Sequence, residues 1–187
     1  MSRPAPSSLQ TSDGARLTVR PLGASEIDAL IRFDAGLSAA TRAVFLPHAY
    51  DPTTVRGYAE RDRRGEDRSY LLFAGEEVAG YFFLWEFDRP VPLLGLGLAD
   101  AWQGRGLGGQ LLRILIVDAR AAGREGVELT TVTTNGRAFR LYVAAGFVPL
   151  GEVENVAGDG RLVREHRMFL ALKPGARPPV REFKPPL

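Results

Sequence analysis

A glycine-rich segment stands directly before the most regular apolar pattern in this chain. It reads AWQGRGLGG over residues 101–109, and apolar residues then recur at every fourth position, at Leu107, Leu111, Leu115 and Ala119. That spacing predicts an amphipathic helix, which Gly123 would end. Ser, Thr, Asp and Asn, the usual helix caps, are absent from residues 103–109. The first backbone amides of the helix are therefore free to bind an anion, and a diphosphate is the natural ligand.

Two phosphate-binding patterns overlap in this segment. The dinucleotide pattern G-x-G-x-x-G fits Gly104, Gly106 and Gly109, whereas Q-x-x-G-x-G fits Gln103, Gly106 and Gly108. A tight turn without any ligand is the structural alternative, because a single G-x-G-x-x-G match is weak support for a site. The surrounding elements are needed to choose between these interpretations.

The rest of the chain predicts an α/β domain. Strand patterns cover residues 16–22, 69–74, 78–88, 91–100, 127–134, 147–153 and 161–172. Helical patterns cover residues 25–37, 52–64, 107–123 and 137–146. Ser25 with Asp28 has the form of a capping box, and Asp51 before Pro52 marks a second helix start. Gly95 and Gly97 indicate a bulge or a close backbone approach in their strand.

This order of elements predicts one mixed, mostly antiparallel sheet. We expect an α/β (α+β) fold of about six or seven strands, with helices on both faces and a central βαβ crossover. A dinucleotide-binding fold requires a doubly wound parallel sheet, and an acid about 20 residues after its loop. Glu125 or Glu128 could nominally be that acid. Because hairpin-connected strands precede the loop and one crossover follows it, the dinucleotide match is interpreted as accidental.

Composition excludes several classes of protein. The chain has 187 residues, no cysteine and a formal net charge of +2, with scattered arginines rather than a basic patch. We therefore expect no disulfide, no cysteine nucleophile and no nucleic-acid partner. His48 and His166 are far apart, so no metal is expected. No apolar run reaches the roughly 18 residues of a membrane span, and the polar start is no signal peptide, so a cytoplasmic protein without a membrane partner is expected.

Domain boundaries follow from the composition of the two ends. Residues 1–14 are rich in Ser, Pro and Gly and are expected to be flexible, and residues 174–187 form a proline-rich tail that is extended on the surface or mobile. A single domain is predicted between them, over residues 15–173.

Two motifs resemble those of a known superfamily. The segment LGLGLADAWQGRGLGGQLL resembles motif A of the GNAT N-acetyltransferases, where Q/R-x-x-G-x-G/A holds the pyrophosphate of acetyl-CoA. Downstream, NGRAFRLYVAAGFVPLG resembles motif B, with an Asn after the fifth strand, a short helix with Ala and Tyr, and then Gly-Phe. The motifs stand in the expected order, and the elements from Arg16 to Leu172 follow the topology of the family. The resemblance implies a GNAT-like fold and acetyl-CoA-dependent N-acetyltransfer.

The resemblance also implies a set of residues that bind acetyl-CoA. The glycine-rich loop would supply amides to the pyrophosphate, and the fourth predicted strand would pair with the pantetheine arm where it separates from the fifth. The short helix of motif B would line the other wall. The set comprises Leu96, Leu98, Gln103, Gly104, Arg105, Gly106, Leu107, Gly108, Gly109, Asn135, Ala138, Phe139 and Tyr142.

For catalysis, the resemblance implies Tyr142 as the general acid for the departing thiolate, with an oxyanion donor from a backbone N–H of the fourth predicted strand. Many relatives have a glutamate near this strand as the base, but here it reads LGLGL without an acid. Glu86, at the end of the third predicted strand, is the best carboxylate candidate, and Asp88, Asp100 and His48 are weaker ones. A water chain is an equal alternative.

The acceptor remains open at this stage. It is expected to be a small amine, an amino sugar or antibiotic, or a peptide amine. Aromatic residues could line its site or belong to the core, namely Phe45, Tyr50, Tyr81, Phe83 and Trp85. Two other functions remain as alternatives, a non-catalytic acyl-CoA-binding module and, less favoured, an NAD-binding oxidoreductase. Either a monomer or a homodimer is expected.

Overall fold

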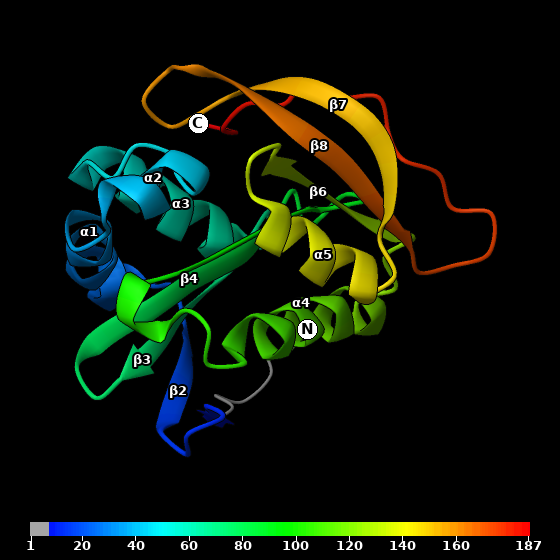
Figure 1. Cartoon of the computed structure of the whole chain (residues 1–187). Coiled ribbons are helices and arrows are strands. Elements are labelled where there is room, and N and C mark those ends of the chain that lie inside the picture. The colour runs from blue at the N-terminus through cyan, green and yellow to red at the C-terminus, as the bar shows by residue number, and fades with distance from the viewer. Residues whose placement is uncertain (1–7) are drawn as a thin grey trace.

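The computed structural model describes residues 8–187. The strands of this part of the chain form one mixed sheet (Figure 1). Within it the strand order is β1-β2-β3-β4-β5-β6-β8-β7, and β5 and β6 form the parallel pair. The eight strands are β1 (Ser8–Gln10), β2 (Arg16–Pro21), β3 (Arg68–Ala74), β4 (Glu77–Trp85), β5 (Leu93–Leu98), β6 (Gly126–Val132), β7 (Val148–Val156) and β8 (Leu162–Ala171). The predicted fold class is confirmed, with one strand more than expected.

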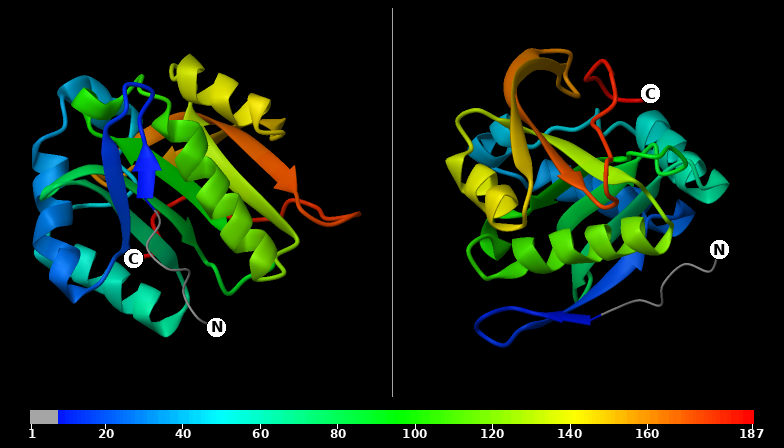
Figure 2. Two further views of the ribbon diagram at one scale, coloured as in Figure 1. Left: turned by 90° about the horizontal axis from the view of Figure 1, so that it is seen from below. Right: turned by 90° about the vertical axis from the view of Figure 1, so that its right-hand side faces the viewer.

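Helices cover both faces of this sheet (Figure 2). They are α1 (Ile27–Ala35), α2 (Ala39–Val44), α3 (Pro52–Arg64), α4 (Leu107–Ala121) and α5 (Gly136–Ala144). Figure 2 shows α4 and α5 together on one face, with α1 and α3 on the other. In the described chain no helix is both long and apolar enough to cross a membrane.

The central strand β4 separates two apolar cores. Phe82 and Leu84 face the core that α4 completes, whereas Tyr81, Phe83 and Trp85 face the core of α1 and α3. A strand buried on both faces carries a continuous apolar run instead of an alternating one. The run AGYFFLW in the sequence is therefore the signature of the middle of the sheet.

The starts of two helices test the predicted caps. Asp51 caps α3, because its carboxylate accepts hydrogen bonds from the Thr53 and Thr54 amides at 3.0 and 3.1 Å. The prediction of a capping box at Ser25 and Asp28 was wrong. Ser25 lies in a 3-10 turn (Ala24–Glu26) ahead of α1 and bonds to the Glu26 carboxylate, and no side chain caps α1. The helix α2 was not predicted from the sequence, because its six residues are too few for a periodic pattern.

Parts of both predicted end segments contact the domain between them. Residues 1–7 lie outside the described residues, but Ser8–Gln10 of the expected flexible segment forms β1, which pairs with β2. The tail has no helix or regular strand, yet it lies against the body of the protein. Phe183 is buried, and its carbonyl accepts a hydrogen bond from the Val156 amide at 3.1 Å.

Candidate active site

A cavity opens where the parallel strands β5 and β6 separate. They pair at Leu93 with Glu128 and at Leu94 with Leu129, after which β5 continues to Leu98 unpaired with β6. The cavity has a volume of about 720 Å³ and is bounded by α2, β5, the glycine-rich loop, α5 and the β7–β8 hairpin. The separation leaves the backbone of one strand edge free to pair with an extended ligand.

The glycines of β5 accommodate aromatic rings and do not form a bulge. The pairing of β4 with β5 is regular from Trp85 to Gly80. A Cβ on Gly95 would lie 2.2 Å from the Phe83 ring, and a Cβ on Gly97 would lie 2.3 Å from the Phe45 ring. The predicted bulge was therefore wrong, and the alternative, a close approach to the backbone, is correct.

The loop before α4 has the geometry of an anion site. Gly104 and Gly106 have φ values of 81° and 76°, a conformation that favours glycine. Gly106 is the N-cap of α4, and no side chain caps the helix. Because residues 106–109 line the cavity, the first turn of α4 presents backbone amides and the positive end of its dipole to that space.

Gln103 holds this loop in place. Its Nε2 donates hydrogen bonds to the Leu98 carbonyl at 3.1 Å and to Thr41 Oγ1 at 3.0 Å. The side chain thereby joins the end of β5 to α2. A glutamine at the first position of the motif thus fixes the loop, while its glycines expose the amides.

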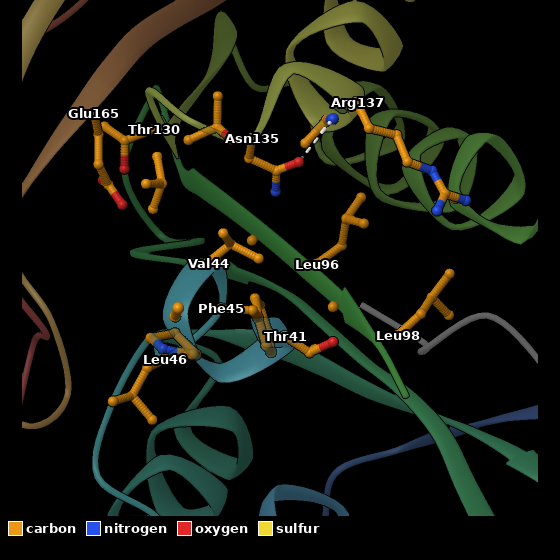
Figure 3. A pocket seen from close by; sticks show the side chains of 18 of the residues that line it. Thr41, Val44, Phe45, Leu46, Leu96, Leu98, Thr130, Asn135, Arg137 and Glu165 are labelled. Atoms are coloured by element: carbon orange, nitrogen blue, oxygen red, sulfur yellow. Dashed lines mark hydrogen bonds between the residues drawn. The ribbon is translucent and has the colours of Figure 1, made fainter. Parts of the chain in front are cut away.

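Helix α5 forms the opposite wall. The Asn135 side chain, seen in Figure 3, caps it by accepting a hydrogen bond from the Ala138 amide at 3.1 Å. Asn135, Ala138 and Tyr142 all line the cavity. A Cβ on Gly108 would lie 3.1 Å from Leu141, so α4 and α5 approach closely here.

Two arginines of α5 add positive charge beside the loop. Arg137 and Arg140 line the cavity, and neither forms an ion pair with any residue between 8 and 187. Arg137 Nη2 would lie 3.7 Å from a Cβ on Gly104. The sequence analysis singled out neither arginine. Their spacing was a usable signal, because Arg137 and Arg140 are three residues apart in the helix that follows Asn135 and therefore lie on one side of it.

Tyr142 is almost completely buried but lines the cavity. Burial raises the pKa of its hydroxyl above the ordinary value of 10.0, and the negative charge of Glu165 raises it further. The hydroxyl therefore stays protonated across the physiological range and can donate a proton.

Eleven of the thirteen residues expected to hold the cofactor line the cavity, and Arg105 and Phe139 do not. Arg105 Nη1 pairs with Asp13 at 3.2 Å on the surface, and its guanidinium lies over the Trp102 ring. Phe139 packs against His166, with ring centroids 4.8 Å apart. Both side chains therefore support the loop and α5 from outside.

The structure does not bring Glu86 to the cavity. Its Oε2 lies 2.9 Å from Arg181 Nη1 of the tail, and the residue has a φ of 53°, in the left-handed region. The interpretation of Glu86 as the base therefore loses its geometric support, because the carboxylate is directed to a different cation. Asp88 is also outside the cavity, and its carbonyl accepts a hydrogen bond from Arg124.

Asp100 lines the cavity but has a structural role. Its carboxylate accepts hydrogen bonds from the Ser38 amide at 3.0 Å, from the Ser38 hydroxyl and from the Thr41 hydroxyl at 2.7 Å. These bonds lower the pKa of Asp100 to about 2. A carboxylate so stabilised is a poor proton acceptor, and it anchors α2 instead.

The aromatic residues divide between cavity and core. Phe45, Phe83 and Trp85 line the cavity, whereas Tyr50 and Tyr81 do not. His48 is fully buried beneath them, stacked 4.3 Å from the Tyr58 ring, and burial lowers its pKa to about 4. His48 is therefore a neutral core residue, and the structure does not support it as the base considered from the sequence.

One carboxylate at the cavity was not considered from the sequence. Glu165 of β8 lines it beside Thr130 of β6, on the side away from Arg137 (Figure 3). It stands in the charged run RLVREHR, where the alternation of a strand indicates two faces without saying which one meets a cavity. No group of three or more metal-ligating side chains occurs in the described part of the chain.

The family comparison agrees with this geometry. Residues 36–147 match the family model described as the acetyltransferase (GNAT) family. The chain belongs to the GNAT family. The resemblance of its two motifs is thereby confirmed, and the matched range includes the loop, α4, β6 and α5. A search of curated proteins gives no match.

Solved GNAT structures share the fold at low sequence identity. The ribosomal-protein-S5-alanine acetyltransferase from Vibrio fischeri is 12% identical with a TM-score of 0.75, covering 93% of this chain and 100% of its own. The yncA protein from Salmonella typhimurium, solved with acetyl-CoA, is 22% identical with a TM-score of 0.69, covering 87% and 98%. RimL, a ribosomal L7/L12 alpha-N-protein acetyltransferase in complex with CoA, is 19% identical with a TM-score of 0.70, covering 83% and 93%.

Proposed function

We propose that this protein transfers the acetyl group of acetyl-CoA to a primary amine. One observation carries the proposal: the uncapped N-terminus of α4 opens onto a cavity formed where β5 and β6 separate. A diphosphate fits the free amides and the dipole of α4, and an extended amide-containing arm fits the free edge of β5. CoA contains both groups.

Residues on two opposite walls of the cavity bind different parts of acetyl-CoA. The loop amides from residue 103 to 109 bind the pyrophosphate, and the backbone at Leu96 and Leu98 binds the pantetheine arm. Asn135, Ala138 and Tyr142 close the opposite wall. A backbone N–H of β5 stabilises the developing charge on the thioester oxygen, and Tyr142 protonates the departing thiolate.

The proposal includes a broader class of acceptors than the names of the similar proteins indicate. Two of the similar structures are acetyltransferases of ribosomal proteins. At 12% and 19% identity this likeness supports the fold, so a small amine, an amino sugar or antibiotic, and a peptide amine all remain acceptors to test.

Two binding titrations and one activity assay test the proposal. We expect CoA to bind and NAD not to bind, measured by calorimetry on the full chain. We also expect acetyl-CoA to release free thiol when spermidine, kanamycin or an alanine-initiated peptide is added. Tight NAD binding without CoA binding would favour the oxidoreductase, and CoA binding without thiol release would favour the acyl-CoA-binding module.

Arg137→Ala is expected to weaken CoA binding about tenfold, because Arg137 supplies an unpaired charge beside the loop. Hydrogen bonds to charged groups contribute about 1.5–3 kcal/mol, and the exposure of Arg137 places its effect at the lower end. Calorimetric titration with CoA measures the change. Arg113→Ala removes an exposed arginine of α4 away from the cavity and serves as the charge-matched control. Equal losses in both variants would show a general charge effect and no phosphate contact.

A further inference from the structure

Two carboxylates line the cavity within the described residues, Asp100 and Glu165. The oxygens of Asp100 already accept three hydrogen bonds from Ser38 and Thr41, which hold α2 in place. Of these two carboxylates, Glu165 is therefore the one that is available to bind a ligand or to accept a proton.

Glu165 is held from one side by a single amide. Asn155 Nδ2 of β7 donates a hydrogen bond to Glu165 Oε2 at 2.7 Å and another to Thr130 Oγ1 of β6 at 3.3 Å. The side chains of three neighbouring strands thus meet at one end of the cavity, and Figure 3 shows Glu165 and Thr130 side by side there. This arrangement orients one carboxylate oxygen through Asn155 and leaves the other for a ligand.

The cations in the cavity wall do not neutralise Glu165. Arg42 pairs with Asp34 at 3.2 Å, Arg161 with Asp159 at 2.5 Å, and Lys184 with Glu182 at 2.8 Å. Arg137 and Arg140 are in α5, the helix that faces the phosphate loop. Within residues 8–187 no cation forms an ion pair with Glu165. A protonated amine entering the cavity would therefore meet a carboxylate without a competing partner.

Glu165 also lies within electrostatic reach of the proposed acid. Its negative charge contributes to the raised pKa of Tyr142. A carboxylate and a protonated phenol thus share one cavity, as an acid and a base that act on one reacting centre require.

We propose that Glu165 is the general base of the transfer and the binding site for the ammonium form of the acceptor, with Asn155 as its positioning residue. This inference rests on the proposed function. Glu165 takes one proton from the ammonium group and passes it to solvent, and the neutral nitrogen attacks the thioester carbon. As the C–S bond breaks, Tyr142 donates its proton to the sulfur and recovers one from the acylated nitrogen. Amide, free thiol and one proton result.

Glu165→Gln tests the proposal because glutamine keeps an oxygen for Asn155 but cannot accept the proton. We expect kcat/KM for the best acceptor among spermidine, kanamycin and the peptide to fall about 100-fold. CoA affinity should stay unchanged. Glu154→Gln, an exposed carboxylate of β7 outside the cavity, is the matched control.

Asn155→Ala separates positioning from folding. We expect a loss of kcat smaller than that of Glu165→Gln, without change in CoA affinity, and little further loss when both substitutions are combined. Independent structural effects would instead add in the double variant.

The outcomes are distinguishable from those of the proposed function. Unchanged kcat/KM in Glu165→Gln, with normal CoA binding, overturns the inference and leaves the acetyltransferase proposal standing. If the wild type binds CoA but acetylates none of the three amines, acetyl-CoA hydrolysis is measured, because water activation needs the same base. Loss of hydrolysis in Glu165→Gln then supports the inference, and unchanged hydrolysis overturns it. Failure of the wild type to bind CoA overturns both.

Discussion

Replacing Tyr142 with phenylalanine is expected to lower kcat at least about 100-fold while leaving CoA affinity unchanged. The substitution removes one oxygen from a side chain that is 4% exposed, so its packing is retained. Because burial raises the pKa of this hydroxyl above 10.0, it should remain a proton donor up to about pH 10. The measurement is thiol release from acetyl-CoA under saturating acceptor, from about pH 6 to pH 10.

Tyr50→Phe is the matched control for this substitution. Tyr50 is also buried, and its hydroxyl has no hydrogen-bond partner within the described chain, but it does not line the cavity. We expect nearly normal kcat in this variant. A Tyr142→Phe enzyme as fast as wild type would show that the thiolate leaves without a protein acid, and that Tyr142 serves packing alone.

Local patterns predicted the half of the cavity wall that presents uncapped backbone amides. The loop glycines, the helix α4 and the short helix after Asn135 all depend on residues within a few positions of one another. The absence of a capping side chain before α4 was visible in the sequence, and the structure confirms that none caps it. Such features need no knowledge of the distant chain.

The residues at the Glu165 end of the cavity, and the placement of Glu86, depended on long-range contacts that no local pattern contains. Glu86 was chosen because it lies at the end of the third predicted strand, but Arg181, 95 residues later, bonds its carboxylate. Glu165 was overlooked because the pairing of β8 with β6 and β7 places it beside Thr130 and Asn155. Alternation along a strand predicts which residues share a face, and register decides which cavity that face meets.

The placement of the C-terminal tail, residues 174–187, also depends on long-range contacts that local patterns do not predict. Its prolines predicted a segment that is extended on the surface or mobile, and in the structure Lys184 and Pro185 line the cavity. The reason is Arg181, whose Nε lies 2.8 Å from Glu128 Oε2 and whose Nη2 donates to the Val91 carbonyl at 2.6 Å. The Glu128 side chain is fully buried in β6, where Arg167 is its second cation. A nominal ribose-binding acid in the sequence is thus the anchor of the C-terminal tail.

Arg181→Met is therefore expected to lower the free energy of unfolding by about 3 kcal/mol, because it leaves a buried carboxylate with one of its two cations. For a chain of this length that corresponds to a fall in melting temperature of about 6–12 °C, measured by circular dichroism. Because the tail contributes Lys184 and Pro185 to the cavity, its release should also raise KM for the acceptor while CoA affinity is retained.

Three further variants separate the ion pair from the tail itself: Arg177→Met, Glu128→Gln and the double variant of Glu128 and Arg181. Arg177→Met removes an exposed arginine of the same segment and should change the melting temperature little. Combining Arg181→Met with Glu128→Gln removes the buried charge along with its partner, so part of the lost stability should return. If Arg181→Met melts like the wild type, the tail is not held by this pair. If the double variant loses the sum of both single effects, Glu128 and Arg181 act independently.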